Sequence, residues 1–217
     1  MKELIKVDSV FLNFGAHELL RGVSLQFSAG QVTGILGRNG CGKSSLLKVI
    51  TGQVQAQSKH LKYQEQHVEH LYKKQGLINY LPQHEFHPSS LRVSELLSFY
   101  SIAESDFIAV YPFLEKTLNS KFGRLSGGER RMVEVALILE SNSKFSILDE
   151  PFTHVMPKYI DLIKARIIQL KHQKGILLTD HQYQNVMEIS DQIYFLVNGV
   201  AKRIDKVEDL QLYGYIR

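Results

Sequence analysis

Apolar and polar positions alternate along the first part of the chain, and this pattern predicts β-strands. Val7–Leu12 and Val23–Phe27 alternate as strands do when one face is buried. Val32–Leu36 is a short apolar run followed by glycine, which is typical of a buried strand leading into a loop. The apolar residues of Lys43–Thr51 have helical spacing instead. Residues 53–76 are polar and glutamine-rich with weak periodicity, so we expect exposed strands and loops there.

After this region the pattern predicts strands that alternate with helices, the order typical of an α/β fold. An Asn198-Gly199 turn between two apolar segments predicts a final β-hairpin. We expect an α/β fold with a mainly parallel central sheet and an antiparallel β subdomain at the N-terminus. The expected strands are Ile78–Leu81, Phe145–Leu148, Ile176–Thr179, Ile193–Val197 and Val200–Ile204, and the expected helices run from Gly128 to about Leu139 and from Pro157 onward.

Between about residues 84 and 124 the character of the sequence changes, and short helical segments replace the strands. Val93–Tyr100 and Phe107–Leu118 predict helices, and prolines interrupt the chain around them. We expect this region to be an α-helical subdomain inserted into one domain. That domain would span residues 1–217, with residues 1–83 and 125–217 as its nucleotide-binding core.

Length and composition fit a globular protein with one sizeable α/β domain, because 217 residues with 44% apolar content lie well outside the disordered range. No apolar run approaches the roughly 18 residues that a membrane-spanning helix needs, and the N-terminus has no apolar signal core. We therefore expect a soluble, cytoplasmic protein. The single cysteine, Cys41, excludes an internal disulfide and fits a reducing compartment.

The charge pattern argues against binding of nucleic acid. The net charge is only +4, and Lys73-Lys74 and Arg130-Arg131 are short pairs, so we interpret them as part of a solvated, mildly basic surface. The histidine pairs His67/His70 and His84/His87 have i, i+3 spacing and invite a metal-site hypothesis. They lack cysteine or acidic ligands at suitable spacing, and we do not expect a structural metal there.

Residues Gly37–Ser44 read Gly-Arg-Asn-Gly-Cys-Gly-Lys-Ser, a phosphate-loop pattern, and lie between an expected strand and an expected helix. The glycines let backbone N–H groups curl around phosphate oxygens. Lys43 is expected to contact the β- and γ-phosphates, and the Ser44 hydroxyl to bind Mg²⁺. The sequence therefore predicts a phosphate-loop NTPase. Its expected nucleotide-binding residues in this loop are Gly37, Asn39, Gly40, Cys41, Gly42, Lys43, Ser44 and Ser45.

Two carboxylates follow the buried strand Phe145–Leu148. Asp149 is placed to hold Mg²⁺ through water, and Glu150 to orient and polarise an attacking water molecule. Taken alone, the pair could be two solvated carboxylates at a strand end. The phosphate loop upstream makes the catalytic interpretation the favoured one.

A second Ser-Gly-Gly sequence lies within Leu125–Glu129, where the long helix is expected to begin. Its backbone N–H groups and the positive end of the helix offer another site for an anion. One phosphate loop is enough to hold one nucleotide. If both motifs bind phosphate, the chain works as a pair, with each copy completing the site of the other.

With these motifs in this order, the chain resembles the ATP-binding-cassette (ABC) ATPases over about residues 5–204. Leu125–Glu129 resembles the family signature, of which Ser126, Gly127 and Gly128 would contact the ATP of a partner cassette. Phe14 resembles the aromatic that stacks on adenine. Gln83 resembles the glutamine that senses Mg²⁺ and the attacking water, and His181 of Thr179-Asp180-His181 resembles the switch histidine at the γ-phosphate.

Each carried-over residue also has a plainer interpretation. Phe14 could pack in the core, and Phe11 is a rival for the stacking role. Gln83 and His181 could be residues without a role in the site, because glutamine and histidine are both frequent in this chain. Cys41 fits a small filler of the loop, although its place beside Lys43 at a helix N-terminus can lower a thiol pKa. On that basis we expect alkylation of Cys41 to block ATPase activity and bound ATP to protect it.

The resemblance implies an ATP-hydrolysing subunit of a membrane transporter, at the cytoplasmic face of the cell membrane. Glu150, His181 and Gln83 would be catalytic, and Ser44, Gln83 and Asp149 would hold Mg²⁺. Its partners would be a second cassette, with a homodimer favoured over a heterodimer, and a separate transmembrane subunit. The alternatives are a soluble ABC ATPase of a non-transport complex, such as one for metal-cluster assembly, and a nucleotide-responsive module that does not hydrolyse ATP.

One position departs from the family pattern. After Glu150-Pro151 the family usually continues to a Leu-Asp pair that crosses the dimer interface, whereas this chain has Val155-Met156. Met156 occupies the aspartate position, so the usual acidic contact there is missing. The departure bears on communication between the two sites, and not on ATP binding or on Glu150.

Overall fold

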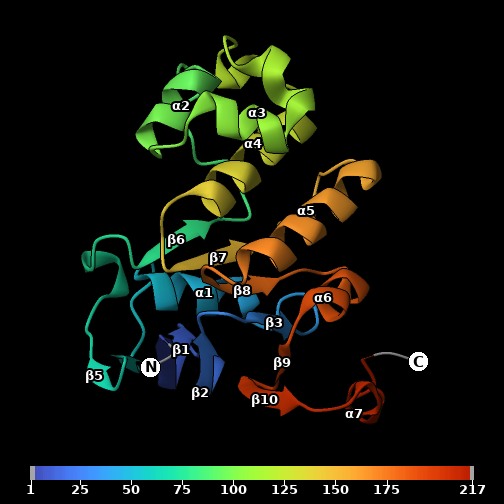
Figure 1. Ribbon diagram of the computed structural model, residues 1–217. Coiled ribbons are helices and arrows are strands. Elements are labelled where there is room, and N and C mark those ends of the chain that lie inside the picture. Colours follow the sequence, from blue (N-terminus) through green and yellow to red (C-terminus); the bar gives the residue numbers. More distant parts are fainter. Residues whose placement is uncertain (1–2, 216–217) are drawn as a thin grey trace.

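The structure is a computed structural model that describes residues 3–215, and it contains two β-sheets with helices between and around them (Figure 1). The larger sheet has the order β10-β9-β3-β8-β7-β6, in which only the β10–β9 pair is antiparallel. A mainly parallel sheet of this kind confirms the predicted α/β class. Its strands are β3 (Val32–Leu36), β6 (Ile78–Leu81), β7 (Phe145–Asp149), β8 (Gly175–Thr179), β9 (Gln192–Val197) and β10 (Val200–Ile204).

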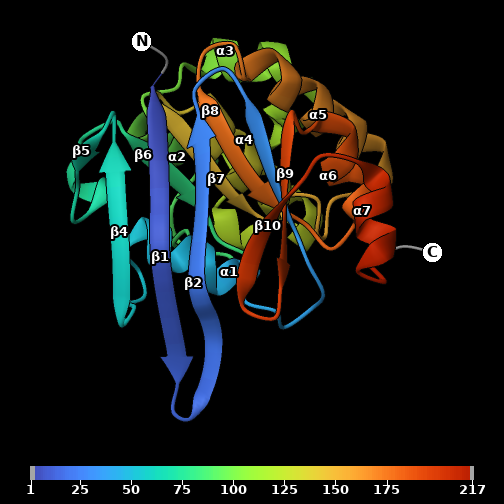
Figure 2. The ribbon, with the colours of Figure 1, turned by 90° about the horizontal axis from the view of Figure 1, so that it is seen from below.

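The smaller sheet is antiparallel and has the order β2-β1-β4-β5. Figure 2 shows the hairpin of its first two strands projecting beyond the rest of the molecule. Both strands are longer than the alternation predicted, because main-chain pairing continues past the last buried side chain to Phe14 and His17. The strands of this sheet are β1 (Leu4–Phe14), β2 (His17–Ser28), β4 (Ser58–Tyr63) and β5 (Gln66–His67), and the turn η1 (Leu71–Lys73) follows.

Apolar faces on both sides of the larger sheet are covered. The helix α1 (Lys43–Thr51) lies between the two sheets, where Leu46, Leu47 and Ile50 are buried. The rings of Phe27 and Phe145 meet edge to face at 5.4 Å and join the sheets directly. The helices α4 (Gly127–Glu140), α5 (Pro157–Leu170) and α6 (Tyr183–Ile189) pack in the core on the opposite face. Full burial of each large apolar side chain contributes about 1.5–3 kcal/mol, so these two layers hold the sheet in place.

The residues between β6 and α4 form short helices that pack together at one end of the molecule (Figure 1). The predicted helix 107–118 is wrong as a single element. Helix α3 ends at Val110, and Pro112 begins a separate 3₁₀ turn, because proline has no N–H to continue a helix and disfavours helical geometry in the residue before it. The elements of this region are α2 (Val93–Phe99), α3 (Glu104–Val110), η2 (Pro112–Thr117) and η3 (Phe122–Arg124).

Two further helices, α6 and α7 (Val207–Leu212), have no counterpart among the elements expected from the sequence. Both are short, and short helices give weak periodic signals. Within the described residues, no helix combines the length and the apolar character that crossing a membrane requires.

Candidate functional site

The carboxyl ends of four parallel strands meet at one edge of the larger sheet, and every group that we predicted to act on the nucleotide of the same chain except Phe14 lies at this edge. The phosphate loop leaves β3 there, and Gln83, Glu150 and His181 follow β6, β7 and β8. Open α/β sheets bind ligands in the crevice outside the carboxyl ends of their strands. A cavity of about 560 Å³ is lined by residues of the phosphate loop together with Gln83, Glu150 and His181.

The phosphate loop has the backbone that its glycines allow. Gly40 and Gly42 have φ of 79° and 106°, in the left-handed region that other residues rarely adopt. A Cβ at Gly40 would meet nothing within 4 Å, so the loop is open on this side. The buried Lys43 ammonium donates to the carbonyl oxygens of Gly37 at 2.8 Å and Arg38 at 3.3 Å. The lysine charge is thereby held across the loop, where a phosphate would need it.

Ser44 and Asp149 lie side by side. The Ser44 hydroxyl donates to Asp149 Oδ1 at 3.0 Å, and the Tyr80 hydroxyl donates to Asp149 Oδ2 at 3.2 Å. Burial raises the pKa of Asp149, while the hydrogen bonds from Ser44 and Tyr80 act in the opposite direction. A hydroxyl and a carboxylate are oxygen ligands of the kind that Mg²⁺ prefers, so the residues present fit this ion.

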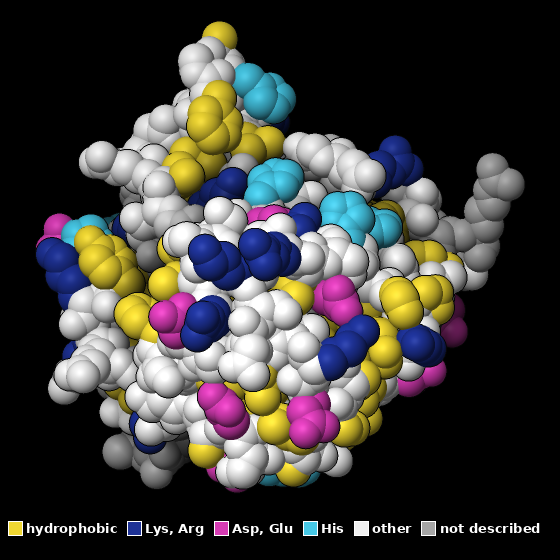
Figure 3. Space-filling view, turned by 90° about the horizontal axis from the view of Figure 1, so that it is seen from above, with side chains coloured by type: hydrophobic (Ala, Val, Ile, Leu, Met, Phe, Trp, Pro, Cys, Tyr) yellow, Lys and Arg dark blue, Asp and Glu magenta, His cyan; other side chains and the backbone are white. Residues whose placement is uncertain are grey.

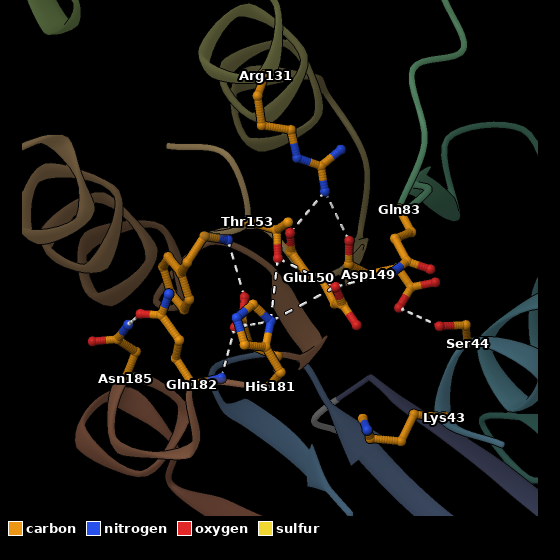
Figure 4. A network of polar contacts seen from close by, with 12 residues as sticks. Lys43, Ser44, Gln83, Arg131, Asp149, Glu150, Thr153, His181, Gln182 and Asn185 are labelled. Atoms are coloured by element: carbon orange, nitrogen blue, oxygen red, sulfur yellow. Dashed lines mark hydrogen bonds and ion pairs between the residues drawn. The ribbon is translucent and has the colours of Figure 1, made fainter. Parts of the chain in front are cut away.

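Glu150 lies at the centre of a polar network (Figure 4), between Gln83 on one side and Thr153 and His181 on the other. The Gln83 amide and the Thr153 hydroxyl donate to Glu150 Oε2 at 3.0 and 3.2 Å. Nδ1 of His181 lies 3.8 Å from the same oxygen and 3.4 Å from Oδ1 of the buried Asp180. The three residues predicted to be catalytic are therefore brought together, although they come from three separate loops.

Ser126, Gly127 and Gly128 do not line this cavity. Ser126 caps α4: its hydroxyl accepts from the Glu129 N–H at 3.3 Å, and its own N–H donates to the Glu129 carboxylate at 3.1 Å. The Ser126 hydroxyl also donates to the Glu129 carboxylate at 2.8 Å, and the hydrogen bonds from the Ser126 N–H and hydroxyl lower the pKa of Glu129. A Cβ at Gly127 would meet nothing within 4 Å. The N-terminus of α4 is thus capped and is open at Gly127, and it lies outside the cavity that holds the phosphate loop of its own chain.

Phe14 is 57% exposed near the tip of the β1–β2 hairpin, so it does not pack in the core. Its rival Phe11 is also exposed, but its ring lies against Gly22, where a Cβ would come within 3.0 Å of it. Phe14 is therefore the freer of the two rings.

The expectation of a lowered thiol pKa is wrong for Cys41. Burial raises the pKa of this thiol, and the opposing effect of Lys43 is smaller. The side chain is half-buried beneath the loop, and a Cβ at Gly37 would come within 2.6 Å of its sulfur. This packing agrees with the interpretation of Cys41 as a small filler.

The interpretation of Arg130-Arg131 as a solvated pair is wrong for Arg131, which is only 4% exposed. It belongs to the part of α4 from Arg131 to Leu139 in which every residue is buried, including Glu134. Sequence reasoning missed Tyr80, Thr153, Arg131 and Glu134. A signal was available for two of them: two opposite charges at i, i+3 within an otherwise apolar helix face indicate a buried pair.

His87, considered above as part of a metal-site pair, instead hydrogen-bonds with Glu134 and with the Tyr100 hydroxyl. Among the residues that the structure describes, no group of three or more His, Cys, Asp or Glu side chains is arranged to hold a metal ion.

Met156 is 46% exposed, precedes α5 and lines a small hollow with Ser126 and Gly128. In Figure 3 basic and acidic side chains are interspersed over the face that is shown.

Comparison with known proteins gives a consistent result. The family model described as ABC transporter matches residues 20–153. The lipopolysaccharide export system ATP-binding protein LptB of Acidithiobacillus ferridurans is 31% identical in an alignment 214 residues long that covers 92% of this chain and 88% of LptB. The probable branched-chain amino acid transport ATP-binding protein LivF of Archaeoglobus fulgidus is 33% identical over 88% of each chain. The solved structure of MJ1267, an ATP-binding cassette of an ABC transporter, has 25% identity and a TM-score of 0.80 over 99% of both chains.

Proposed function

Because the chain belongs to the ABC transporter family and is similar to the ATP-binding subunits of transporters, we propose that it binds and hydrolyses ATP to power a separate membrane subunit. The observation that carries this proposal is the meeting of Gln83, Glu150 and His181 beside the phosphate loop in one cavity. A chain that only held a nucleotide would need the loop but not this second set of groups.

Glu150 is the proposed general base. Its carboxylate lines the cavity, and Gln83 and Thr153 both donate to one of its oxygens, which leaves the other oxygen to accept a proton from water. A positioned base of this kind contributes about 10²- to 10⁴-fold in rate. His181 and Gln83 would orient the water and the γ-phosphate. Mg²⁺, held by Ser44, Asp149 and Gln83, would neutralise charge on the phosphates.

The proposed working unit contains two cassettes. Ser126–Gly128 offer an open helix N-terminus to an anion, but they lie outside the cavity that holds the phosphate loop of the same chain. A second copy, turned head to tail, would present its signature to this loop and complete the site. Two identical chains are sufficient for such an arrangement, so we propose a homodimer.

The proposed contact with the membrane subunit is the groove between the Gln83 loop and the helices of residues 84–124. Phe86 and Phe99 are exposed in this region, Phe99 by 81%. Large exposed apolar side chains are typical of surfaces that meet a partner. The cassette would therefore lie on the cytoplasmic face of the membrane, and the membrane subunit would select the cargo.

Two measurements on the purified full chain and on cells test the proposal. Turnover of MgATP, with loss on removal of Mg²⁺ by EDTA, tests hydrolysis; nucleotide binding without turnover, even with the native membrane partner, would favour a non-hydrolysing module. Co-fractionation with membranes, and pull-down of a multi-span protein from them, tests the transport role. An active ATPase that stays entirely in the soluble fraction would favour a non-transport complex.

A further inference from the structure

One arginine joins the two main-chain segments that carry Glu150 and Gln83. Nη2 of Arg131 donates to the carbonyl oxygens of Asp149 and Glu150, each at 2.8 Å, and Nη1 donates to the carbonyl oxygen of Pro82 at 2.8 Å. Figure 4 shows this side chain reaching from α4 toward the end of β7. The planar fork of arginine suits this contact, because it directs several donors at fixed angles and lysine directs them from a single point.

The backbone that Arg131 contacts is strained. Glu150 has φ of 52°, a left-handed conformation that costs a residue with a Cβ free energy unless its surroundings fix it. The Glu150 N–H is held by the carbonyl oxygen of Thr179 at 2.8 Å, and the Asp149 and Glu150 carbonyl groups are held by Arg131. The conformation that aims the Glu150 carboxylate into the cavity thus depends on hydrogen bonds from two neighbouring elements.

The guanidinium group of Arg131 also forms an ion pair within α4. Glu134 Oε2 lies 3.6 Å from Arg131 Nη1, and both side chains are buried. Glu134 Oε1 accepts from the Phe86 N–H at 3.1 Å and contacts His87 Nδ1 at 3.2 Å. A charge buried this deeply keeps its position because any move away from these partners would leave it without compensation. The pair therefore ties the loop after Gln83 to α4 as well.

Arg131 and Ser126 belong to the same helix, since Ser126 caps α4 and Arg131 follows soon after. We propose that Arg131 is a positioning residue that couples the signature end of α4 to Glu150 and Gln83 of the same chain. In a cassette pair, the signature contacts the partner's ATP while Arg131 holds the hydrolytic groups of its own site. Arg131 then carries communication between the two sites, in a chain where Met156 replaces the usual acidic contact. This inference rests on the proposed function.

The test compares the full-length wild type with Arg131→Met, Arg131→Lys and a control, Arg166→Met. Arg166 is partly buried and makes a bidentate pair with Glu140, but it contacts neither loop. We expect Arg131→Met to lower kcat for MgATP about 10- to 100-fold and to bring the Hill coefficient toward 1. Affinity for a non-hydrolysable fluorescent ATP analogue should stay within about twofold. Arg131→Lys, which keeps the charge, should have a kcat between those of the wild type and Arg131→Met. Arg166→Met should retain the wild-type kcat.

Hydrogen exchange supplies a readout that needs no turnover. In Arg131→Met, the backbone amides of residues 82–87 and of residues 149–153 should exchange about tenfold faster than in the wild type, because hydrogen bonds to a charged donor are lost. In Arg166→Met, the exchange of these amides should be unchanged. If the wild type hydrolyses ATP and Arg131→Met keeps its kcat and Hill coefficient, the inference is wrong and the proposed function stands. If the wild type does not hydrolyse ATP, the proposed function fails, and exchange still decides whether Arg131 holds both loops. Should Arg131→Met not fold, Arg131→Lys gives the same comparison.

Discussion

The side-chain amide of Gln83 donates a hydrogen bond of 3.0 Å to the carboxylate of Glu150, although the two residues lie far apart in the sequence. They meet because β6 and β7 are parallel neighbours, with Leu81 opposite Leu148, so the residues that follow each strand emerge at the same edge. The contact joins Gln83 and Glu150 in the lining of the cavity.

We expect Glu150→Gln to lower kcat for ATP by about 10²- to 10⁴-fold, because the amide cannot accept the proton from water. The variant should still bind MgATP and accumulate as an ATP-bound dimer, which light scattering detects. Glu140→Gln is the matched control, since Glu140 is a partly buried carboxylate that pairs with Arg166 away from the site. A Glu150→Gln protein with wild-type turnover would refute the assignment of the general base.

Ser126→Asp distinguishes two roles of Ser126, as the cap of α4 and as a contact for a phosphate. Aspartate caps helices as well as serine does, so the fold should be kept, but its charge would oppose a phosphate group. Like charges brought together cost several kcal/mol, so turnover should fall at least about 100-fold while nucleotide binding to the monomer is unchanged. Ser126→Thr should stay active. Equal turnover in both variants would contradict a contact between signature and phosphate.

Phe14→Ala tests the stacking role against its rival. Loss of an aromatic contact costs about 0.5–1.5 kcal/mol, so KM for ATP should rise about two- to tenfold with little change in kcat. Phe11→Ala removes a similar ring that packs on Gly22, and it should leave KM unchanged. The opposite result, with KM raised only by Phe11→Ala, would exchange the two assignments.

Alkylation of Cys41 should be slow and should depend on pH. Burial raises the pKa of this thiol, so less of the reactive thiolate is present at pH 7 than in free cysteine. Iodoacetamide should therefore modify it more slowly than free cysteine, and the rate should climb about tenfold per pH unit below the pKa. The adduct should block turnover, and bound MgATP should protect. Cys41→Ala, treated in the same way, shows whether adducts on other residues affect turnover. Full activity of the wild type after mass spectrometry has verified the modification of Cys41 would overturn the prediction.

Lys174 should make the stability of the fold depend on pH in the alkaline range. Its buried ammonium donates to the carbonyl oxygens of Leu139 and Ser141, and burial lowers its pKa from 10.5 to about 8. Between these values the unfolded chain holds more protons than the folded one, so the free energy of unfolding rises with pH. The free energy of unfolding of the wild type minus that of Lys174→Met should therefore increase from pH 8 to 10.5, by at most about 1.4 kcal/mol per pH unit. Urea unfolding in matched buffers measures it, and a difference that is flat over this range would contradict it.

Much of the fold was readable from local pattern. The runs Val32–Leu36 and Ile78–Leu81 are strands with the predicted bounds, and the Asn198-Gly199 turn joins β9 to β10 as expected. In β3 every residue is buried, as expected for a central strand covered on both faces, and Asn-Gly adopts the positive φ of a tight hairpin turn. The prediction of one helix over residues 107–118 is wrong because it relied on the spacing of apolar residues, whereas Pro112 begins a separate 3₁₀ turn.

The phosphate loop, the acidic pair, the signature and their order can all be recognised in the sequence, because each motif is a short stretch whose residue types serve one chemical purpose. Which of these groups meet depends on the packing of the strands. Parallel pairing of β6, β7 and β8 brought Gln83, Glu150 and His181 to one edge, and it left Ser126 outside that cavity. The structure also showed that Arg131, one of two adjacent arginines, is buried against three carbonyl groups while Arg130 lies nearer the surface. Such contacts depend on residues distant in sequence, and the helix position that buries a charge becomes visible only when its partners are in place.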